Sequence, residues 1–380
     1  MIIFLAGCWD HINIEERGFV IGTAVDKAVE DSNEHINVAL TNQIVSPAGL
    51  GTPTSDSSDE TPYVNLTTIG ESLFAINRQM LKKTSRIPFY EHLRLAIVSE
   101  EVAHDAELFA SLMDVFMRDQ EMRRGIKIMI AEDKAKNVLE VDPDPEKLPV
   151  MHIDMITENA YKSMDMIKPV TLGNLHSFLL NDSSYVLPKI TVLEDKVDYN
   201  GVAVFHGSND KMVGSLNSHE TKGMNLIKGG IKGGMIKFKV EDHIMAFDID
   251  DAKSQMEIDT NNPKSMDIYI TIETEGKLAE MYGSKTLLNP SYLEKMEEKV
   301  AERIEELANQ TIEKAQNELK LDILDIGKVL KRKHYSTWKK VEKDWEEGEN
   351  YFANSRIHVS ADVKVRETGA TDRAKKREHE

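Results

Sequence analysis

The sequence predicts a mixed α/β protein of the α+β class, with three domains that each pack helices on a mixed sheet. Segments with strand-like alternation of apolar and polar residues recur along the chain, and segments with helical periodicity lie between them. No short repeat of fixed length is visible, which argues against a solenoid. The chain has 380 residues, more than one hydrophobic core usually serves, so we expect several domains.

The first predicted domain covers residues 9–147. Strands are expected at 18–22, 36–45, 64–68, 92–99 and 126–131, and helices at 71–83 and 105–123. Residues 52–60 form a polar loop without side chains to bury. Three prolines among acidic residues in 141–149 indicate the end of this domain.

The middle domain is predicted over residues 151–230. Helices are expected at 153–166 and 172–180, a strand at 188–193, and a hairpin from 201–206 and 212–216. Ser218 is the expected N-cap of a short helix over 220–227. The glycine-rich segment 229–234 lacks the Gly-Lys-Ser/Thr ending of a phosphate loop and precedes a strand, so we interpret it as a flexible connection.

The third domain is predicted over residues 231–369. Strands are expected at 236–240, 266–272 and 357–365, where apolar and polar residues alternate. Asn289 and Pro290 mark the start of a long helix that ends near Leu319. A second helical stretch over 323–345 would place Trp338 and Trp345 on one face, packed in the core. We expect the charged tail, residues 370–380, to be disordered.

Composition limits the classes of partner. The chain has 47 basic and 65 acidic residues, a formal net charge of −18, which keeps it soluble and repels both nucleic-acid phosphates and anionic lipid head groups. Nucleic acid is therefore not an expected partner. No apolar run approaches the ~20 residues that a membrane-spanning helix needs.

No group of residues indicates catalysis. Glu100 and His104 have the i,i+4 spacing of a metal pair and Glu101 lies beside them, but no cysteine or second histidine nearby completes a site. We interpret these acids as favourable charges at a helix N-terminus. There is no Gly-x-Ser-x-Gly motif, and the twelve histidines are dispersed. We expect no catalytic residue, no metal site and no cofactor.

The only cysteine, Cys8, follows the apolar run MIIFLAG. Leu5-Ala6-Gly7-Cys8 has the form of a bacterial lipobox, whose cysteine receives a diacylglycerol, and two acyl chains give stable membrane anchoring. The alternative is a buried N-terminal strand that ends in an inert core cysteine. No basic residue precedes Cys8 and the apolar run is short, so we expect residues 1–8 to be the remnant of a longer signal peptide that starts upstream.

Residues spread along the whole chain resemble one known family. They are Cys8-Trp9-Asp10, 15–22 (EERGFVIG), Asp26, 88–94 (PFYEHLR), 100–102 (EEV), 118–123 (RDQEMR), 201–205 (GVAVF), 212–216 (MVGSL), Glu220, 232–234 (KGG), Trp338-Lys339-Lys340, Trp345 and 363–369 (VKVRETG). In this order they are similar to the spore germination lipoproteins of the Ger(x)C type, the C subunits of GerA-family nutrient germinant receptors. The short signal departs from that pattern, as does 366–369, where the family more often has paired basic residues.

The resemblance implies a lipoprotein of three mixed α/β domains, anchored through Cys8 on the outer face of the spore inner membrane. It also implies a complex with two integral membrane subunits, A and B, that triggers spore germination, and no catalytic activity of the C subunit. Two other functions stay open: a solute-binding lipoprotein of a membrane transporter, and an anchored extracytoplasmic hydrolase.

Overall fold

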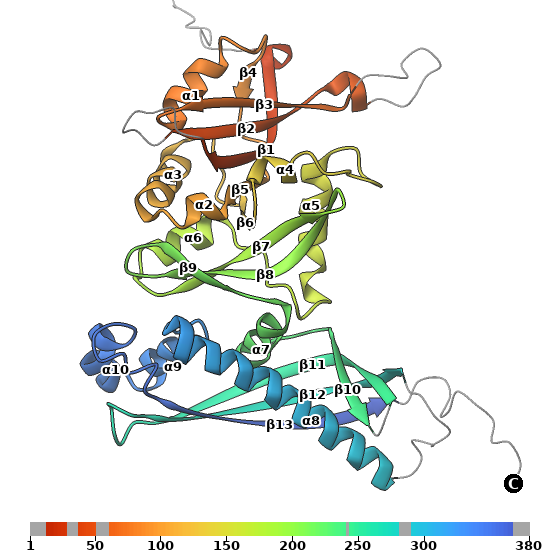
Figure 1. Ribbon diagram of the computed structural model, residues 1–380, viewed down its shortest axis with the longest axis vertical. Helices are drawn as coiled ribbons and strands as arrows, with labels where there is room; N and C mark the ends of the chain where they lie inside the picture. The colour runs from red at the N-terminus through yellow and green to blue at the C-terminus, as the bar shows by residue number, and fades with distance from the viewer. Residues whose placement is uncertain (1–12, 29–36, 51–60, 241–242, 281–289, 368–380) are drawn as a thin grey trace, which may run out of the picture. The chain divides into compact units, whose positions relative to one another are not determined.

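The computed structural model describes residues 13–28, 37–50, 61–240, 243–280 and 290–367 (Figure 1). The chain forms two compact units and passes between them several times. Unit 1 holds residues 1–155, 170–177 and 190–198, and unit 2 holds residues 156–169, 178–189 and 199–380. Strands and helices alternate in both, so the predicted mixed α/β class is confirmed. The division into domains at 9–147, 151–230 and 231–369 stays a prediction.

Unit 1 is built on a mixed sheet with short helices around it. In strand order β3-β2-β1-β5-β6, β2 is antiparallel to β1 and β3, whereas β5 is parallel to β1 and β6; β4 pairs separately with the start of β1. The strands are β1 (Arg17–Lys27), β2 (Val38–Val45), β3 (Tyr63–Gly70), β4 (Ile87–Phe89), β5 (Leu95–Ser99) and β6 (Lys127–Ala131). The helices are α1 (Leu73–Met80), α2 (Glu100–Ala103), α3 (Ala106–Arg118), α4 (Ala135–Val138), and most of α5 (Pro149–Thr157) and α6 (Leu172–Leu179).

The burial patterns of unit 1 follow from strand position. β5 has a strand on each side and is buried at every residue, whereas the edge strand β3 is mostly exposed or half-buried. Helix α3 buries Phe109, Leu112, Met113 and Phe116 at helical spacing, and the Asp105 side chain caps its first turn by accepting from the Leu108 N–H at 3.2 Å. Periodicity and capping therefore account for these elements locally.

Unit 2 contains a hairpin and a second sheet, with strand order β10-β11-β12-β13. Figure 1 shows α8 lying across one face of that sheet, where it buries residues such as Met296, Val300 and Ile304. The strands are β9 (Lys211–Leu216), β10 (Met235–Val240), β11 (His243–Asp259), β12 (Asp267–Glu280), β13 (Arg356–Glu367), and parts of β7 (Tyr185–Leu193) and β8 (Lys196–His206). The helices are α7 (Ser218–Lys228), α8 (Pro290–Glu313), which continues as a π-helical turn (Lys314–Leu319), α9 (Ile326–Lys333) and α10 (Tyr335–Val341).

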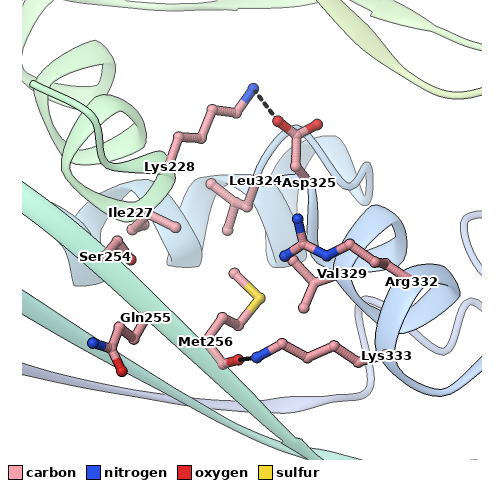
Figure 2. A pocket seen from close by; sticks show the side chains of 10 residues that line it. All are labelled: Ile227, Lys228, Ser254, Gln255, Met256, Leu324, Asp325, Val329, Arg332 and Lys333. Carbon is pink, nitrogen blue, oxygen red and sulfur yellow. Dashed lines mark hydrogen bonds and ion pairs between the residues drawn. The ribbon is translucent and has the colours of Figure 1, made fainter.

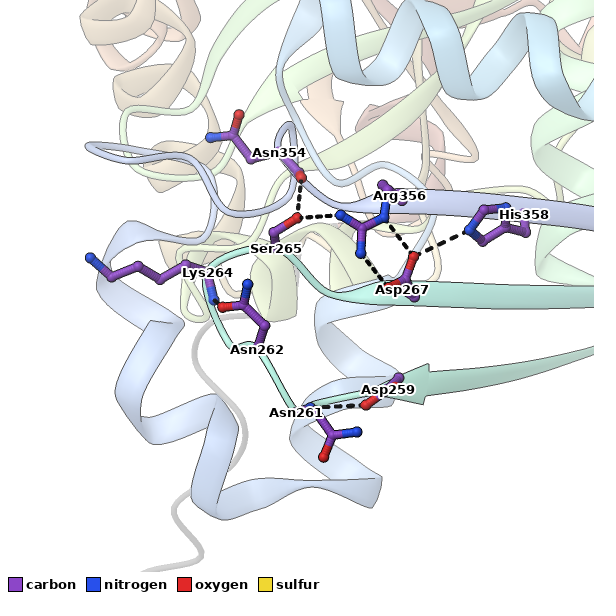
Figure 3. Close-up of polar contacts among 9 residues, drawn as sticks. All are labelled: Asp259, Asn261, Asn262, Lys264, Ser265, Asp267, Asn354, Arg356 and His358. Atoms are coloured by element: carbon purple, nitrogen blue, oxygen red, sulfur yellow. Dashed lines mark hydrogen bonds and ion pairs between the residues drawn. The ribbon is translucent and has the colours of Figure 1, made fainter.

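An ion pair lies where the parallel strands β12 and β13 begin (Figure 3). Arg356 lies in register with Asp267, and its guanidinium forms a two-point contact with that carboxylate and donates to Ser265 Oγ at 3.1 Å. His358 Nε2 lies 3.3 Å from the same carboxylate, and its ring stacks on Tyr269. The hydrogen bonds from Arg356, and then His358, lower the pKa of Asp267 to about 2.

Two details of the predicted helices are wrong. The N-cap of α7 is Asn217, not Ser218: Asn217 Oδ1 accepts from the Glu220 N–H at 3.0 Å, and Glu220 Oε2 accepts from the Asn217 N–H at 2.7 Å. The continuous helix expected over 323–345 is broken into α9, α10 and a 3-10 turn, because His334 leaves the helical region at φ −134° and ψ 55°.

Strand β11 is absent from the predicted elements, although it has 17 residues. Its register on β12 shifts between Ile249 and Asp251, so the alternation of buried and exposed residues changes phase at the acidic run 248–251. The other predicted strands and helices are found, but some bounds differ by several residues. The helix expected over 153–166 is α5, which ends at Thr157 and is followed by a 3-10 turn (Glu158–Tyr161), and β12 runs to Glu280 instead of ending at 272. The predicted disordered tail (370–380) and most of the polar loop (52–60) lie outside the described residues.

Candidate functional site

Cys8, the predicted lipidation residue, lies outside the described residues. Glu100 and Glu101 lie in the first turn of α2, as predicted. Glu100 Oε1 is 3.5 Å from His104 Nε2, and Glu101 pairs with Lys134 at 2.9 Å. Within the described parts of the chain, no group of three or more His, Cys, Asp or Glu side chains is placed to hold a metal ion.

The glycine-rich segment 229–234 connects the end of α7 with the start of β10, as predicted. Gly229 has φ +71° and its N–H donates to the Asn225 carbonyl at 2.8 Å, which ends the helix. Gly234 has φ +139°, and a Cβ there would lie 2.2 Å from Met164 Cγ. These glycines therefore serve the turn and a close approach of the backbone.

A pocket of about 380 Å³ lies in unit 2, between the end of α7, β11 and α9 (Figure 2). Its wall combines apolar side chains with three bases and one acid. The lining residues are Ile227, Lys228, Ser254, Gln255, Met256, Leu324, Asp325, Val329, Arg332 and Lys333. The sequence pattern does not predict this pocket, because it joins segments about 100 residues apart.

Two of the three bases are engaged at the pocket rim. Lys228 Nζ lies 3.2 Å from Asp325 Oδ2, and Lys333 Nζ donates to the Met256 carbonyl at 2.8 Å. Burial opposes ionisation of Asp325, but Lys228 and Lys328 outweigh it and lower its pKa. Arg332 has no hydrogen bond or ion pair with any described residue, and Figure 2 shows it directed into the pocket. Three basic side chains around one pocket suit a small anion.

A carboxylate pair, the buried Asp322 and the half-buried Glu346, joins the segments on either side of α9 and α10. Asp322 accepts four N–H groups: those of Leu324 and Ile326 at 3.2 and 3.0 Å, that of Gly327 at 2.5 Å, and Trp345 Nε1 at 2.9 Å. Glu346 accepts from the Asp322 N–H at 2.5 Å and from Ser184 Oγ at 3.0 Å. The pair therefore satisfies donors that burial would otherwise leave unpaired.

The two tryptophans of this region pack together, as predicted, although they do not share one helix face. Trp345 is 4% exposed, and its ring lies edge-to-face with that of Trp338 at 5.9 Å between centroids. Sequence reasoning missed Asp322 and Glu346, whose only signal is an acid between apolar residues (LDILDI) and one beside a tryptophan (DWEE).

Stability is expected to fall as pH rises from about 4.5 to about 7, and Glu346→Gln is expected to remove part of this fall. Burial, and then the charge of Asp322, raises the pKa of Glu346 to about 7, from 4.5 in an unfolded chain. The folded protein therefore keeps a proton that the unfolded chain releases in this range, so the contribution of Glu346 is full below pH 4.5 and is lost by pH 7.

Urea unfolding at several pH values measures this effect. Between pH 4.5 and pH 7 we expect the free energy of unfolding of wild type to fall by roughly 1–3 kcal/mol more than that of Glu346→Gln. The exposed neighbour Glu347→Gln is the matched control and should follow wild type. Equal slopes for wild type and Glu346→Gln would contradict the assignment.

Two family models match the chain in sequence order. The model described as "Spore germination protein N-terminal domain" matches residues 10–192, and that described as "Spore germination B3/ GerAC like, C-terminal" matches residues 200–369. The chain belongs to the GerAC-like family of spore germination proteins. The resemblance of the chain to spore germination proteins of the Ger(x)C type is confirmed.

Curated relatives of this GerAC-like chain match over almost its full length. Spore germination protein YndF of Bacillus subtilis (strain 168) is 27% identical, with 97% of this chain and 95% of the relative covered. Spore germination protein A3 of the same strain is 28% identical, with 97% and 95% covered. Spore germination protein B3 is 27% identical, with 91% of each chain covered.

A solved structure supports the fold of the GerAC-like chain. The crystal structure of the GerBC protein superposes with a TM-score of 0.62 at 22% identity, covering 90% of this chain and 98% of that one. None of the described helices is both long and apolar enough to span a bilayer.

Proposed function

We propose that the chain is the lipid-anchored C subunit of a spore nutrient germinant receptor. The family match across residues 10–369 carries this proposal, since both halves match in order. The lipobox at Cys8 would hold the chain on the outer face of the spore inner membrane, where the integral membrane subunits A and B would bind it. The chain would take part in triggering germination through this complex and catalyse no reaction.

Loss of the anchor is the direct test. Cys8→Ala should move the protein from the membrane to the soluble fraction of spore lysates and slow nutrient-triggered germination, because one thiol carries the acyl chains. Fractionation, the mass of the Cys8 peptide and the optical-density loss of germinating spores measure these effects. Immunoblotting must show equal amounts of variant and wild type.

Co-purification from detergent-solubilised spore membranes completes this test. A tagged wild-type chain should bring down both integral membrane subunits. Normal germination by spores that hold only soluble Cys8→Ala protein would contradict the anchor, and the absence of both membrane subunits would contradict the receptor complex.

A further inference from the structure

One face of unit 1 is basic although the chain as a whole is acidic. Residues 72–90 contain four bases and no acid, in a chain with a net charge of −18. All four side chains are exposed, and none forms a hydrogen bond or ion pair with a carboxylate among the described residues. These bases are Arg78, Lys82, Lys83 and Arg86.

The same face carries large apolar side chains that the fold does not bury. On α1, Leu73, Ile76 and Met80 are buried in unit 1. Phe74 is nevertheless 67% exposed, and Leu81, the C-cap residue of α1, is 43% exposed. Arg78 lies between Phe74 and Leu81 in the sequence. Its guanidinium carbon is 5.4 Å from the centroid of the Phe74 ring.

The start of β1 lies next to this stretch of chain, because β1 pairs with β4. Tyr90 Oη, just after β4, donates to Asn77 Oδ1 of α1 at 2.7 Å, and Figure 1 shows both elements at one end of unit 1. Ile87 of β4 is 43% exposed and pairs in register with Arg17 of β1. Ile14, three residues before Arg17, is 64% exposed.

We call this surface the basic apolar face. Its residues are the exposed bases and large apolar side chains of the stretch 72–90: Phe74, Arg78, Leu81, Lys82, Lys83, Arg86 and Ile87. Ile14 follows Cys8 by six residues, a length of chain that spans at most ~20 Å. The face therefore lies on the part of the protein that an acylated Cys8 would keep near a bilayer.

We propose that the basic apolar face lies against the anionic head groups of the bilayer, with Phe74 and Leu81 entering the interface. This proposal rests on the proposed function only in that Cys8 brings the chain to a membrane. Exposed bases around large apolar side chains are the composition of interfacial membrane contacts. The contact would orient unit 1 on the lipid surface, which a flexible acyl tether alone does not do.

Charge screening reconciles this contact with the acidic chain. The net charge of −18 predicts repulsion from anionic lipids, but that expectation averages over the whole surface. At physiological ionic strength charges are screened beyond about 8 Å. Apart from Glu71 and Glu91, which flank the stretch, acids far from this face therefore act weakly on it. The unpaired bases at the face then decide the local interaction.

Vesicle binding by the non-acylated full chain, Cys8→Ala, tests the proposal without the anchor. We expect co-sedimentation with vesicles of phosphatidylcholine and phosphatidylglycerol, weakened by high salt, and little with phosphatidylcholine alone. The added changes R78Q, K82Q, K83Q and R86Q should lower the partition coefficient by at least about tenfold. A separate variant with F74S and L81S should lower it as well, and thermal unfolding checks that both variants are folded.

A matched control removes the same charge from a second acid-free basic stretch, residues 326–341 and its flank. K331Q, K339Q, K340Q and K343Q should bind vesicles as the Cys8→Ala parent does. Three results would overturn the proposal. In the first, the Cys8→Ala chain does not bind anionic vesicles at all, and in the second, the control variant loses as much vesicle binding as the face variants. In the third, the face variants bind vesicles normally but no longer co-purify with the membrane subunits. The last result would assign the face to a protein partner.

The two proposals fail in different ways. The vesicle assay uses a chain that cannot be acylated, so a negative result leaves the anchor at Cys8 untouched. An unacylated Cys8 peptide in native spores would instead refute the proposed anchor and leave the vesicle result standing.

Discussion

Asp322→Ala is expected to lower the free energy of unfolding by about 4 kcal/mol, since several buried donors lose one acceptor. Asp322 accepts three backbone N–H groups from 324–327 and the Trp345 indole N–H. Each buried donor left without a partner costs about 1–3 kcal/mol, and removal of the buried charge offsets part of this cost. Urea unfolding followed by tryptophan fluorescence measures the change.

Asp322→Asn separates the acceptor role from the charge. One amide oxygen can still accept, but the amide NH₂ would face the donors Gly327 N–H and Trp345 Nε1, so we expect an intermediate loss of stability. Asp362→Ala, on the exposed side of β13, is the matched control and should change stability by less than about 0.5 kcal/mol. A loss below ~1 kcal/mol for Asp322→Ala would show that water replaces the carboxylate.

Gly223→Ala is expected to destabilise the protein by about 3 kcal/mol, because α7 and α8 meet at this glycine. A Cβ at Gly223 would lie 2.2 Å from both the Leu307 carbonyl oxygen and Thr311 Oγ1. The carbonyl belongs to the backbone of α8 and cannot turn aside, so the helices would have to separate. Separation would also strain the hydrogen bond from Thr311 Oγ1 to the Glu220 carbonyl, 2.8 Å long.

Gly125→Ala is the matched control for this substitution. A Cβ at Gly125 has nothing within 4 Å, so we expect a change of less than about 0.5 kcal/mol. Thermal unfolding of the two variants at equal protein concentration makes the comparison. Equal melting temperatures would contradict a close α7–α8 contact.

The free edge of the second sheet shows how a helix can protect a strand. Glu305 Oε1 accepts from the Ala361 N–H and Glu297 Oε1 from the Val365 N–H, each at 2.9 Å. The two glutamates are eight residues apart on α8, a rise of ~12 Å, and the two N–H groups are four residues apart on β13, ~13 Å. This match lets helical carboxylates occupy edge donors that could otherwise pair with another strand.

Secondary structure was predictable where one periodicity holds over a whole element. The alternation at Ile357–Val365 predicts β13, and the spacing of Met296, Val300 and Ile304 predicts α8. Prediction failed where geometry changes within an element. The register shift near Ile249 changes the alternation of apolar residues, so β11 was not predicted. The non-helical backbone of His334 divides what the sequence pattern predicts as one helix.

The lipobox-like residues before Cys8 and the family resemblance were available from the sequence, because a short motif and a spread of family residues can be read without the fold. The carboxylate pair and the basic apolar face were not. Glu346 binds Ser184, which is 162 residues away, and α1 presents Phe74 outward while Ile76 is buried, a choice that depends on which side of α1 meets the rest of unit 1.

The sequence alone therefore determined the fold class, most strands and helices, and the family, since periodicity, caps and family residues act over short stretches of chain. The tertiary structure alone decided which acids are buried, which bases lack partners and which apolar side chains stay at the surface. Burial and charge pairing depend on neighbours brought together from distant segments, and no local pattern contains them.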